Sequence, residues 1–188
     1  MVGQPSYLGV ATGDWVAGLK SSDALERRLA AHALAEIGPA AREAVPALIE
    51  ALRDQQSFVR VWAAAALARV QPENPDAIPA LVAGTRDGIS FVRSLAAWHL
   101  GRLGPGHPGI ESVVPELREV LDDNDPSVRT EAQAALENLA SKGAPPAELK
   151  SLAPTADPAV APSRRHRRHA RDDAHQHSGV HSRRQADS

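Results

Sequence analysis

The feature that most constrains the fold of this 188-residue chain is an internal repeat. Four arginines mark it, at spacings of 33, 33 and 36 residues: Arg27, Arg60, Arg93 and Arg129. Relative to each arginine, alanine stands at offset +3, leucine at +7 and an aliphatic residue at +10, and valine stands at −1 in three of the four. These offsets share one face of a helix with 3.6 residues per turn, so each block predicts an amphipathic helix.

In each repeat a second helix is predicted before the arginine-bearing helix, which we call the inner helix. Pro46, Pro79 and Pro115 each follow a β-branched residue and stand eight residues before an aspartate. Proline favours the first turn of a helix, where its missing N–H has no intrahelical partner. Asp23 and Asp125 are predicted N-caps of the first and last inner helices. The pattern predicts an all-α fold, a right-handed α-solenoid of four helix–turn–helix repeats.

The same alignment predicts where helices end and where the solenoid begins and ends. Gly38 and Gly104 lie one residue past the apolar pattern and are predicted to end helices in a left-handed conformation. The three extra residues of the longest interval fall in the loop 104–109. At offsets +2 and +4 the first three repeats carry apolar residues, which predicts contacts between repeats. The fourth carries Glu131 and Gln133 there and is predicted to be the C-terminal cap. We therefore expect an N-terminal extension, a solenoid and a tail over residues 1–12, 13–140 and 141–188.

Composition agrees with helices and limits the chemistry. Aromatic residues make up 3% of the chain while alanine is abundant, as in closely packed helices. The absence of cysteine excludes disulfides and thiolate chemistry. No run approaches the roughly 18 apolar residues that span a bilayer, and residues 1–13 lack the features of a secretory signal. We expect a soluble, cytoplasmic protein.

Charge is distributed unevenly along the chain. Residues 1–140 hold 12 Lys and Arg against 18 Asp and Glu, a balance of −6, whereas residues 141–188 hold 9 against 5, a balance of +4. The tail has few apolar residues after Val160 and is predicted to be disordered. Its basic cluster has the charge to attract nucleic acid, anionic lipid, an acidic protein or the acidic body of the chain itself. The cluster consists of Arg164, Arg165, Arg167, Arg168 and Arg171.

Three repeats share a proline-led helix that ends in aspartate, followed by Val-Arg and then Ala and Leu. Over about residues 13–140 this pattern resembles the HEAT repeat family and its bacterial branch named after the phycobilisome lyases. The first repeat departs from it, with Gly13 and Ser21 in place of the proline and the aspartate. The resemblance implies a binding scaffold, since the family serves many unrelated partners.

Aspartate and arginine recur six residues apart across the turn inside each of the last three repeats. Such groups are suited to acid and electrophile roles, but a catalytic site is usually unique whereas a structural device repeats. We therefore interpret them as a ladder that ties neighbouring repeats, with arginine donating to turn carbonyls and carboxylates. The pairs are Asp54/Arg60, Asp87/Arg93 and Asp123/Arg129. No catalytic residue and no cofactor are assigned, and the chain is not expected to be an enzyme.

Trp98 is the main candidate for partner binding. At offset +5 it points about 160° away from the centre of the apolar face, in the sector where the first repeat places His32. Arg69 and Arg102, both at offset +9, lie close to the same sector. Tryptophan and arginine are enriched at binding hot spots, so these four residues are the predicted partner-binding candidates. The alternative is that Trp98 packs on its own helix or under the long loop. Trp62 is assigned to packing between repeats.

No metal site is predicted. His32, His99 and His107 lie in different repeats or in a loop, without the spacing of a zinc site. The tail has five more histidines, which are suited only to weak binding of Zn²⁺ or Ni²⁺.

The leading functional hypothesis is a non-enzymatic protein–protein interaction scaffold that presents its inner helices to a protein partner. One alternative is a nucleic-acid-associated protein that binds through the basic tail, with a steep dependence on salt. Another is a phycobilisome-lyase-like protein, which the resemblance alone suggests. Neither the partner's identity nor the oligomeric state is predicted.

Overall fold

The computed structural model describes residues 5–141. The chain divides into two units, residues 1–152 and 153–188, and every described residue belongs to the first. The predicted tail, including its arginine cluster and histidines, lies almost entirely outside the described residues.

The described part contains eight α-helices, two short 3₁₀ segments and one two-stranded hairpin. The helices are α1 (Thr12–Gly18), α2 (Ala24–Ile37), α3 (Val45–Ala51), α4 (Ser57–Val70), α5 (Ala77–Gly84), α6 (Ser90–Leu103), α7 (Val113–Val120) and α8 (Pro126–Ser141). The 3₁₀ segments η1 (Gly38–Ala44) and η2 (Ile110–Ser112) precede α3 and α7.

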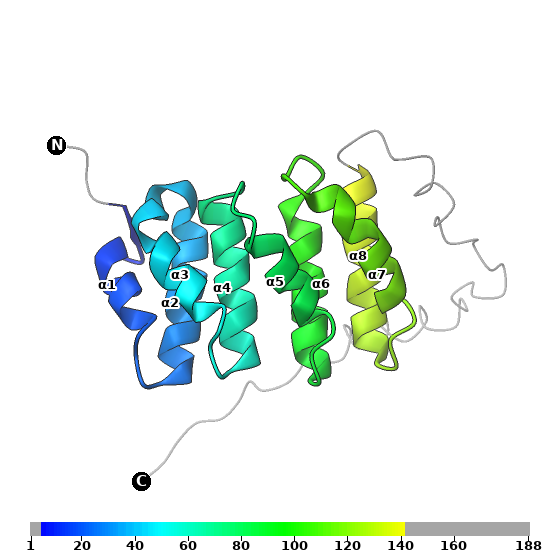
Figure 1. Cartoon of the computed structure of the whole chain (residues 1–188), viewed down its shortest axis with the longest axis horizontal. Helices are drawn as coiled ribbons and strands as arrows, with labels where there is room; N and C mark the ends of the chain where they lie inside the picture. Colours follow the sequence, from blue (N-terminus) through cyan, green and yellow to red (C-terminus); the bar gives the residue numbers. More distant parts are fainter. Residues whose placement is uncertain (1–4, 142–188) are drawn as a thin grey trace, which may run out of the picture. The chain divides into compact units, whose positions relative to one another are not determined.

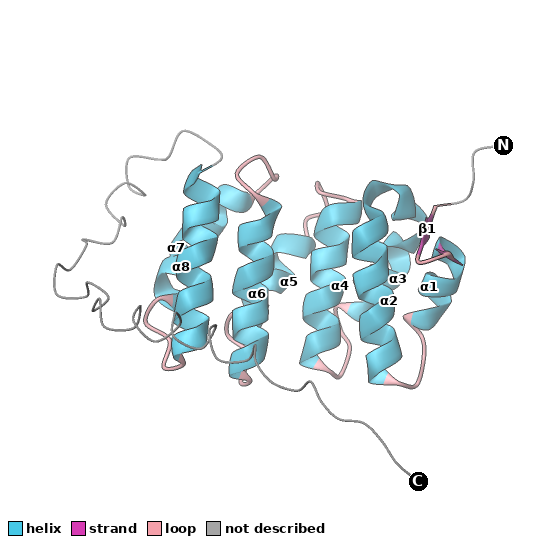
Figure 2. Ribbon diagram, turned by 180° about the vertical axis from the view of Figure 1, so that it is seen from behind, coloured by secondary structure: helices cyan, strands magenta, loops and turns pink. Residues whose placement is uncertain are grey.

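The helices form two layers. The shorter helices α1, α3, α5 and α7 lie in front in Figure 1. The longer helices α2, α4, α6 and α8, which carry the repeated arginines, lie in front in the opposite view of Figure 2. We call these four the inner helices. Each pairs with the short helix before it, and α2, α4 and α6 also pack against the inner helix of the next repeat. The described residues therefore form an all-α solenoid of four helix pairs, as predicted.

The predicted helix ends are mostly observed. Asp23 and Asp125 cap α2 and α8, each accepting a hydrogen bond of 2.9 Å from the backbone N–H two residues on. Gly38 and Gly104 end α2 and α6 with φ of 65° and 78°. Their ψ angles of −140° and 169° are extended, so the left-handed conformation predicted for both is wrong in ψ. The positive φ still favours glycine, because a Cβ is disfavoured there.

The core consists of the residues that repeat in sequence. The leucines at offset +7 of the inner helices are at most 1% exposed, and their counterparts on α3, α5 and α7 are fully buried. The alanines at offset +3 are also fully buried, which lets the two layers approach closely. These residues are Leu34, Leu67, Leu100, Leu136, Leu48, Leu81, Leu117, Ala30, Ala63, Ala96 and Ala132.

A hairpin precedes the first repeat. The strands β1 (Ser6–Tyr7) and β2 (Val10–Ala11) pair antiparallel around Leu8 and Gly9. Residues 6–11 are therefore a hairpin and not a further helical repeat. β1 contacts α2 and places the Tyr7 ring 6.0 Å from that of His32. No helix of the described residues is long and apolar enough to cross a membrane.

Candidate functional site

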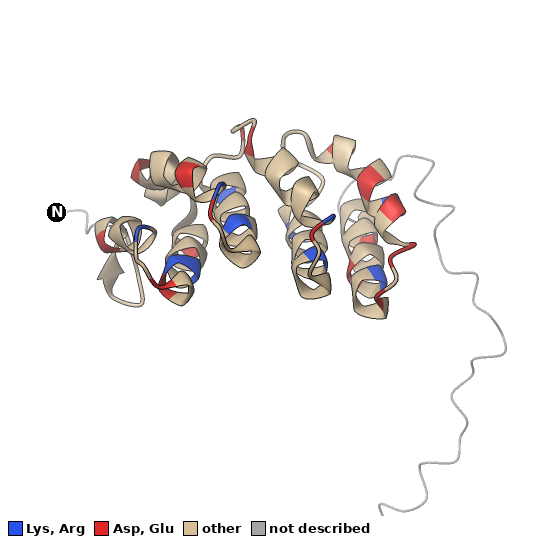
Figure 3. Ribbon diagram, turned by 60° about the horizontal axis from the view of Figure 1, so that its bottom comes forward, with Lys and Arg blue, Asp and Glu red and all other residues tan. Residues whose placement is uncertain are grey.

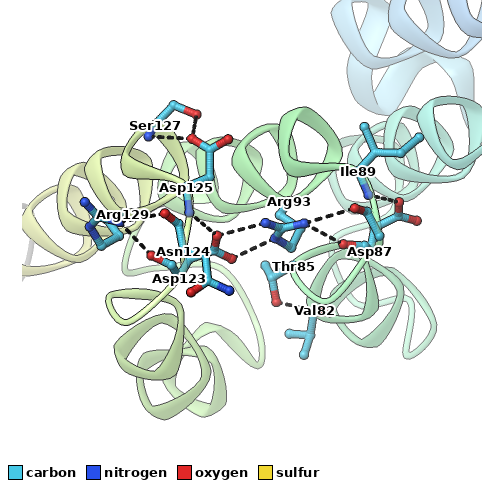
Figure 4. Close-up of polar contacts among 11 residues, drawn as sticks. Val82, Thr85, Asp87, Ile89, Arg93, Asp123, Asn124, Asp125, Ser127 and Arg129 are labelled. Carbon is cyan, nitrogen blue, oxygen red and sulfur yellow. Dashed lines mark hydrogen bonds and ion pairs between the residues drawn. The ribbon is translucent and has the colours of Figure 1, made fainter.

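The repeated arginines join consecutive repeats through the turns between the helices. Figure 3 shows basic residues on the longer helices and acidic residues on the turns beside them. Arg93 donates through Nε and Nη2 to both carboxylate oxygens of Asp123, at 2.7 and 2.8 Å. Its Nη1 donates to the backbone carbonyl of Asp87 at 2.9 Å (Figure 4). The carboxylate that Arg93 binds therefore belongs to the next repeat, whereas the aspartate six residues earlier supplies only its carbonyl oxygen.

Two other arginines also bind a carboxylate of the next repeat. Arg27 binds the carboxylate of Asp54 at 2.6 and 3.0 Å, and Arg60 binds that of Asp87 at 3.3 Å. Arg129 binds only the carbonyls of Asp123 and Asn124, because no repeat follows it among the described residues. Arg27 was not among the predicted ladder residues because the first repeat has Ser21 where the other repeats have an aspartate six residues before the arginine.

Each ladder aspartate also organises its own turn. The Oδ1 atoms of Asp54, Asp87 and Asp123 accept hydrogen bonds from the backbone N–H two residues later, at 2.8, 3.0 and 2.9 Å. The hydrogen bonds from Arg93 hold the pKa of the Asp123 carboxyl below its usual range, and those from Arg27 do the same for Asp54. Each of these carboxylates accepts hydrogen bonds from an arginine of the preceding repeat and from a backbone N–H of its own turn, which agrees with a structural role.

A different surface lies on the outward side of the inner helices. Offsets −2, +2, +5 and +9 follow one another at helical spacing and form a stripe along each helix. We call the three stripes of the first three repeats the inner-helix face. It comprises Leu25, Leu29, His32 and Glu36 on α2, then Phe58, Trp62, Ala65 and Arg69 on α4, and Phe91, Leu95, Trp98 and Arg102 on α6.

The character of this face changes along the helices. Its first row is apolar: Phe91 is 62% and Leu25 is 51% exposed, and Phe58 is half-buried. Phe58 lies between them, and its ring centroid is 5.6 Å from that of Phe91. The middle rows carry aromatic rings, and the last row carries the charges of Glu36, Arg69 and Arg102. Leu29 was expected between repeats but is 46% exposed, because offset +2 belongs to the outward stripe.

A hollow of about 440 Å³ occupies the middle and last rows. The four predicted candidates Trp98, Arg69, Arg102 and His32 all line it. The hollow also contains two residues that the sequence analysis did not assign to it, Trp62 and His99. Ala65 and Ala68 lie between the larger side chains, and their small size leaves room for the hollow.

Aromatic rings in the hollow form a continuous series across three repeats. Trp62 on α4 contacts His32 on α2 and His99 on α6, with ring centroids 4.8 and 4.6 Å apart. Trp98 contacts His99 at 4.8 Å. All three pairs are edge-to-face, with interplanar angles of 71° to 81°. This geometry is the favourable one for aromatic rings and fixes their orientation.

The two arginines are held differently. The guanidinium carbon of Arg102 lies 4.6 Å from the centroid of the Trp98 ring, a cation–π contact. Among the described residues no carboxylate forms an ion pair with Arg102. Arg69 donates to Glu36 at 2.8 Å, in a pair that is about 40% exposed on both sides. Trp98 itself is 37% exposed, so this tryptophan and its arginine both face solvent.

His99 is the buried polar residue of the hollow. It is 7% exposed, and its Nε2 atom has no hydrogen-bond partner among the described residues. Burial, together with the positive charges of Arg102 and Arg69, lowers the pKa of His99 to about 3. The ring is therefore neutral at physiological pH and adds no positive charge to that of Arg69 and Arg102.

The long loop after α6 closes one end of the hollow. His107 reaches back across a repeat and places Nε2 2.9 Å from the carbonyl oxygen of Ala68 in the last turn of α4. The three extra residues of this interval thus allow a contact between α4 and the loop. Residues 104–109 therefore help to shape the hollow as well as connecting two repeats.

Comparisons with known proteins agree with this architecture. The family model described as HEAT repeats matches residues 14–101, and the PBS lyase HEAT-like repeat matches residues 92–123. Residues 14–123 therefore belong to the HEAT-repeat family, with a phycobilisome-lyase-type repeat at their C-terminal end. The comparison with curated proteins gave no match.

Two solved structures illustrate the likeness. The crystal structure of an engineered protein is 28% identical with a TM-score of 0.52, over 75% of this chain and 66% of that one. The complex of CpcE and CpcF of phycocyanin lyase from Nostoc sp. PCC7120 is 21% identical with a TM-score of 0.55, over 75% of this chain and 85% of that one. The second likeness concerns the fold alone.

Proposed function

We propose that this HEAT-repeat protein is a non-enzymatic scaffold that binds a protein partner on its inner-helix face. The observation that carries the proposal is the recurrence of exposed or half-buried apolar and aromatic side chains at offsets −2 and +2 in three adjacent repeats. Contiguous exposed apolar surface typically marks an interaction site, because the removal of apolar surface from water has a favourable free energy.

The limits of the face support the same assignment. On α8 the equivalent offsets carry Ser127, Glu131, Ala134 and Asn138, which are suited to solvent. The apolar and aromatic character therefore stops after the third repeat. A surface of this kind that was needed only for stacking repeats would not leave Phe91 and Leu25 mostly exposed.

Trp98 and Arg102 are the proposed anchors. They are an aromatic ring and a guanidinium in contact with each other, partly exposed and next to a hollow into which a partner side chain fits. Truncating an anchor of this kind typically weakens binding by about 2 kcal/mol or more. The HEAT-type repeats support the scaffold.

The test is to capture partners from the source cells with the full-length chain and with Trp98→Ala and Arg102→Ala. We expect both variants to lose the captured partner while their circular dichroism and melting temperatures stay close to those of the parent. Arg53→Ala removes an exposed arginine from the turn after α3, outside the inner-helix face, and is the matched control. Equal capture by all four proteins would exclude the inner-helix face as the binding surface.

A further inference from the structure

The inner-helix face is apolar in its first row and charged in its last row, and this order indicates which groups its partner must present. We infer that the face binds a peptide segment whose apolar side chains are followed, about one helical turn further on, by a carboxylate. This inference rests on the proposed function and specifies the chemistry of the partner.

The apolar end of the segment is defined by the first row. Leu25, Phe58 and Phe91 occupy offset −2 of adjacent inner helices, and Ile89 next to them is 49% exposed. Adjacent packed helices are typically about 8 to 10 Å apart, so these side chains form one strip across three repeats. Burying a large apolar side chain against such a strip contributes roughly 1.5 to 3 kcal/mol, which favours apolar partner residues here.

The acidic end is defined by Arg69 and Arg102. They occupy offset +9 of adjacent repeats and line the same hollow. Arg102 lacks an ion-pair partner among residues 5–141, and Arg69 has one that is exposed and can be shared. A carboxylate placed between them would accept charge-assisted hydrogen bonds in a site partly shielded by Trp98 and His107. His99, which lines the same hollow, is neutral there, and its Nε2 atom has no hydrogen-bond partner among the described residues.

The spacing between the two ends follows from helix geometry. Offset +5, at Trp98, and offset +9, at Arg102, are separated by four residues, or about 6 Å along the helix axis. Offset −2, at Phe91, lies seven residues on the other side of Trp98, or about 10 Å away. The segment therefore presents one apolar group to the first row, a second to Trp98, and its carboxylate about 6 Å beyond the second.

Charge favours an acidic segment over the basic residues 141–188 of the chain itself as the occupant of this face. Residues 141–188 carry a balance of +4, which is a poor match for the arginine end of the hollow. The balance of −6 over residues 1–140 repels an acidic segment from most of the remaining surface. Electrostatic complementarity of this kind restricts the docking position more than it adds affinity.

The first experiment is a selection of random 16-residue peptides, displayed on phage, against the full-length chain. We expect the enriched peptides to share apolar positions followed by Asp or Glu and to be depleted of Lys and Arg at that position. A selection that enriches nothing, or that enriches basic peptides, would contradict the inference.

The second experiment is a charge exchange with one enriched peptide, labelled and followed by fluorescence anisotropy. Arg102→Glu should weaken binding about tenfold or more, and replacing the acidic residue of the peptide by Lys should restore binding to that variant. Phe91→Ser should weaken binding severalfold without changing the preference for the acid. Arg53→Glu makes the same charge change outside the inner-helix face and should leave the affinity unchanged.

The outcomes separate this inference from the proposed function. Peptides that need Trp98 but contain no conserved acid would overturn the inference and leave the scaffold intact. Peptides that bind equally to the parent, Trp98→Ala and Arg102→Glu would overturn both. Self-association of the chain that Phe91→Ser abolishes, measured by sedimentation velocity, would show that a second copy occupies the face and would also overturn the inference.

Discussion

Leu8 has an unusual backbone conformation for a branched side chain. Its φ is 53° and that of Gly9 is 79°, so both central residues of the hairpin turn have positive φ, as a type I′ turn requires. A left-handed conformation costs a non-glycine residue roughly 1 kcal/mol. Leu8 is 81% exposed, so packing within the described residues offsets little of this cost.

Leu8→Asn is therefore expected to stabilise the chain. Asparagine tolerates positive φ and is preferred before glycine in such turns, so the free energy of unfolding should rise by about 0.5–1 kcal/mol. Urea unfolding followed by circular dichroism measures the change. Leu8→Ala removes the same side chain without that tolerance and is the control, for which little gain is expected. A loss of stability in Leu8→Asn would mean that the leucine side chain makes a stabilising contact.

His99 makes the stability of the fold depend on pH. In the unfolded chain its pKa is near the ordinary 6.5, whereas in the folded chain it is about 3. Between these values the unfolded state binds a proton that the folded state does not. The stabilisation is thus fully present above pH 6.5 and is lost as the pH falls towards 3, by at most about 1.4 kcal/mol per pH unit.

The variant His99→Gln tests this dependence. It removes the titrating group, so the free energy of unfolding should fall less between pH 6.5 and 4 in the variant than in the parent. Urea denaturation at four pH values in that range gives both slopes, and the carboxylates contribute to both proteins alike. Parallel slopes would show that the ring can be protonated without unfolding its surroundings.

At the scale of helices and turns, two arginines at the same offset differ in their hydrogen-bond partners. Arg93 binds the carboxylate of Asp123 and the carbonyl of Asp87, whereas Arg129 at the same offset binds carbonyls only. Arg93→Ala leaves the mostly buried carboxylate of Asp123 without its partner and should lower the free energy of unfolding by roughly 1–3 kcal/mol. Arg129→Ala should have a clearly smaller effect. Equal melting temperatures for Arg93→Ala and the parent would exclude a structural role for the ladder.

Gly101 allows α6 and α8 to approach each other closely. A Cβ built on Gly101 would lie 2.6 Å from the Cα and 2.8 Å from the Cβ of Ala135. Gly101→Ala should therefore destabilise the chain by about 1–3 kcal/mol, although alanine favours helices. Gly13→Ala in α1, where nothing lies within 4 Å, should instead be neutral or stabilising. Thermal melts of both variants measure the contrast. A stabilised Gly101→Ala would show that the two helices separate readily.

The repeat alignment predicted the elements well because each of its positions reports a helix face. The buried leucines, the caps at Asp23 and Asp125 and the order of helix pairs follow directly from periodicity. The hairpin before α1 and the close approach at Gly101 were not predicted. A hairpin that occurs once leaves no periodic signal, and an approach between helices depends on how repeats stack.

At the scale of the whole molecule, equal offsets in successive repeats become neighbours in space. From this relation the sequence predicts that Arg69 and Arg102 lie in the same sector of adjacent repeats. In the structure both line one hollow. The apolar row at offset −2 was not predicted, although Leu25, Phe58 and Phe91 recur there in the sequence. His99 could not be assigned in the same way, because its offset is alanine in the other three repeats and its burial depends on two tryptophans from different helices.

The central claim is that a protein partner covers the inner-helix face. Hydroxyl-radical footprinting with mass spectrometry, on the full-length chain with and without its captured partner, measures this directly. Phe91 and Trp98 should each lose most of their reactivity when the partner binds. Leu8, which is 81% exposed and lies outside this face, should keep its reactivity and serves as an internal control. Unchanged reactivity of Phe91 and Trp98 in the complex would contradict the claim.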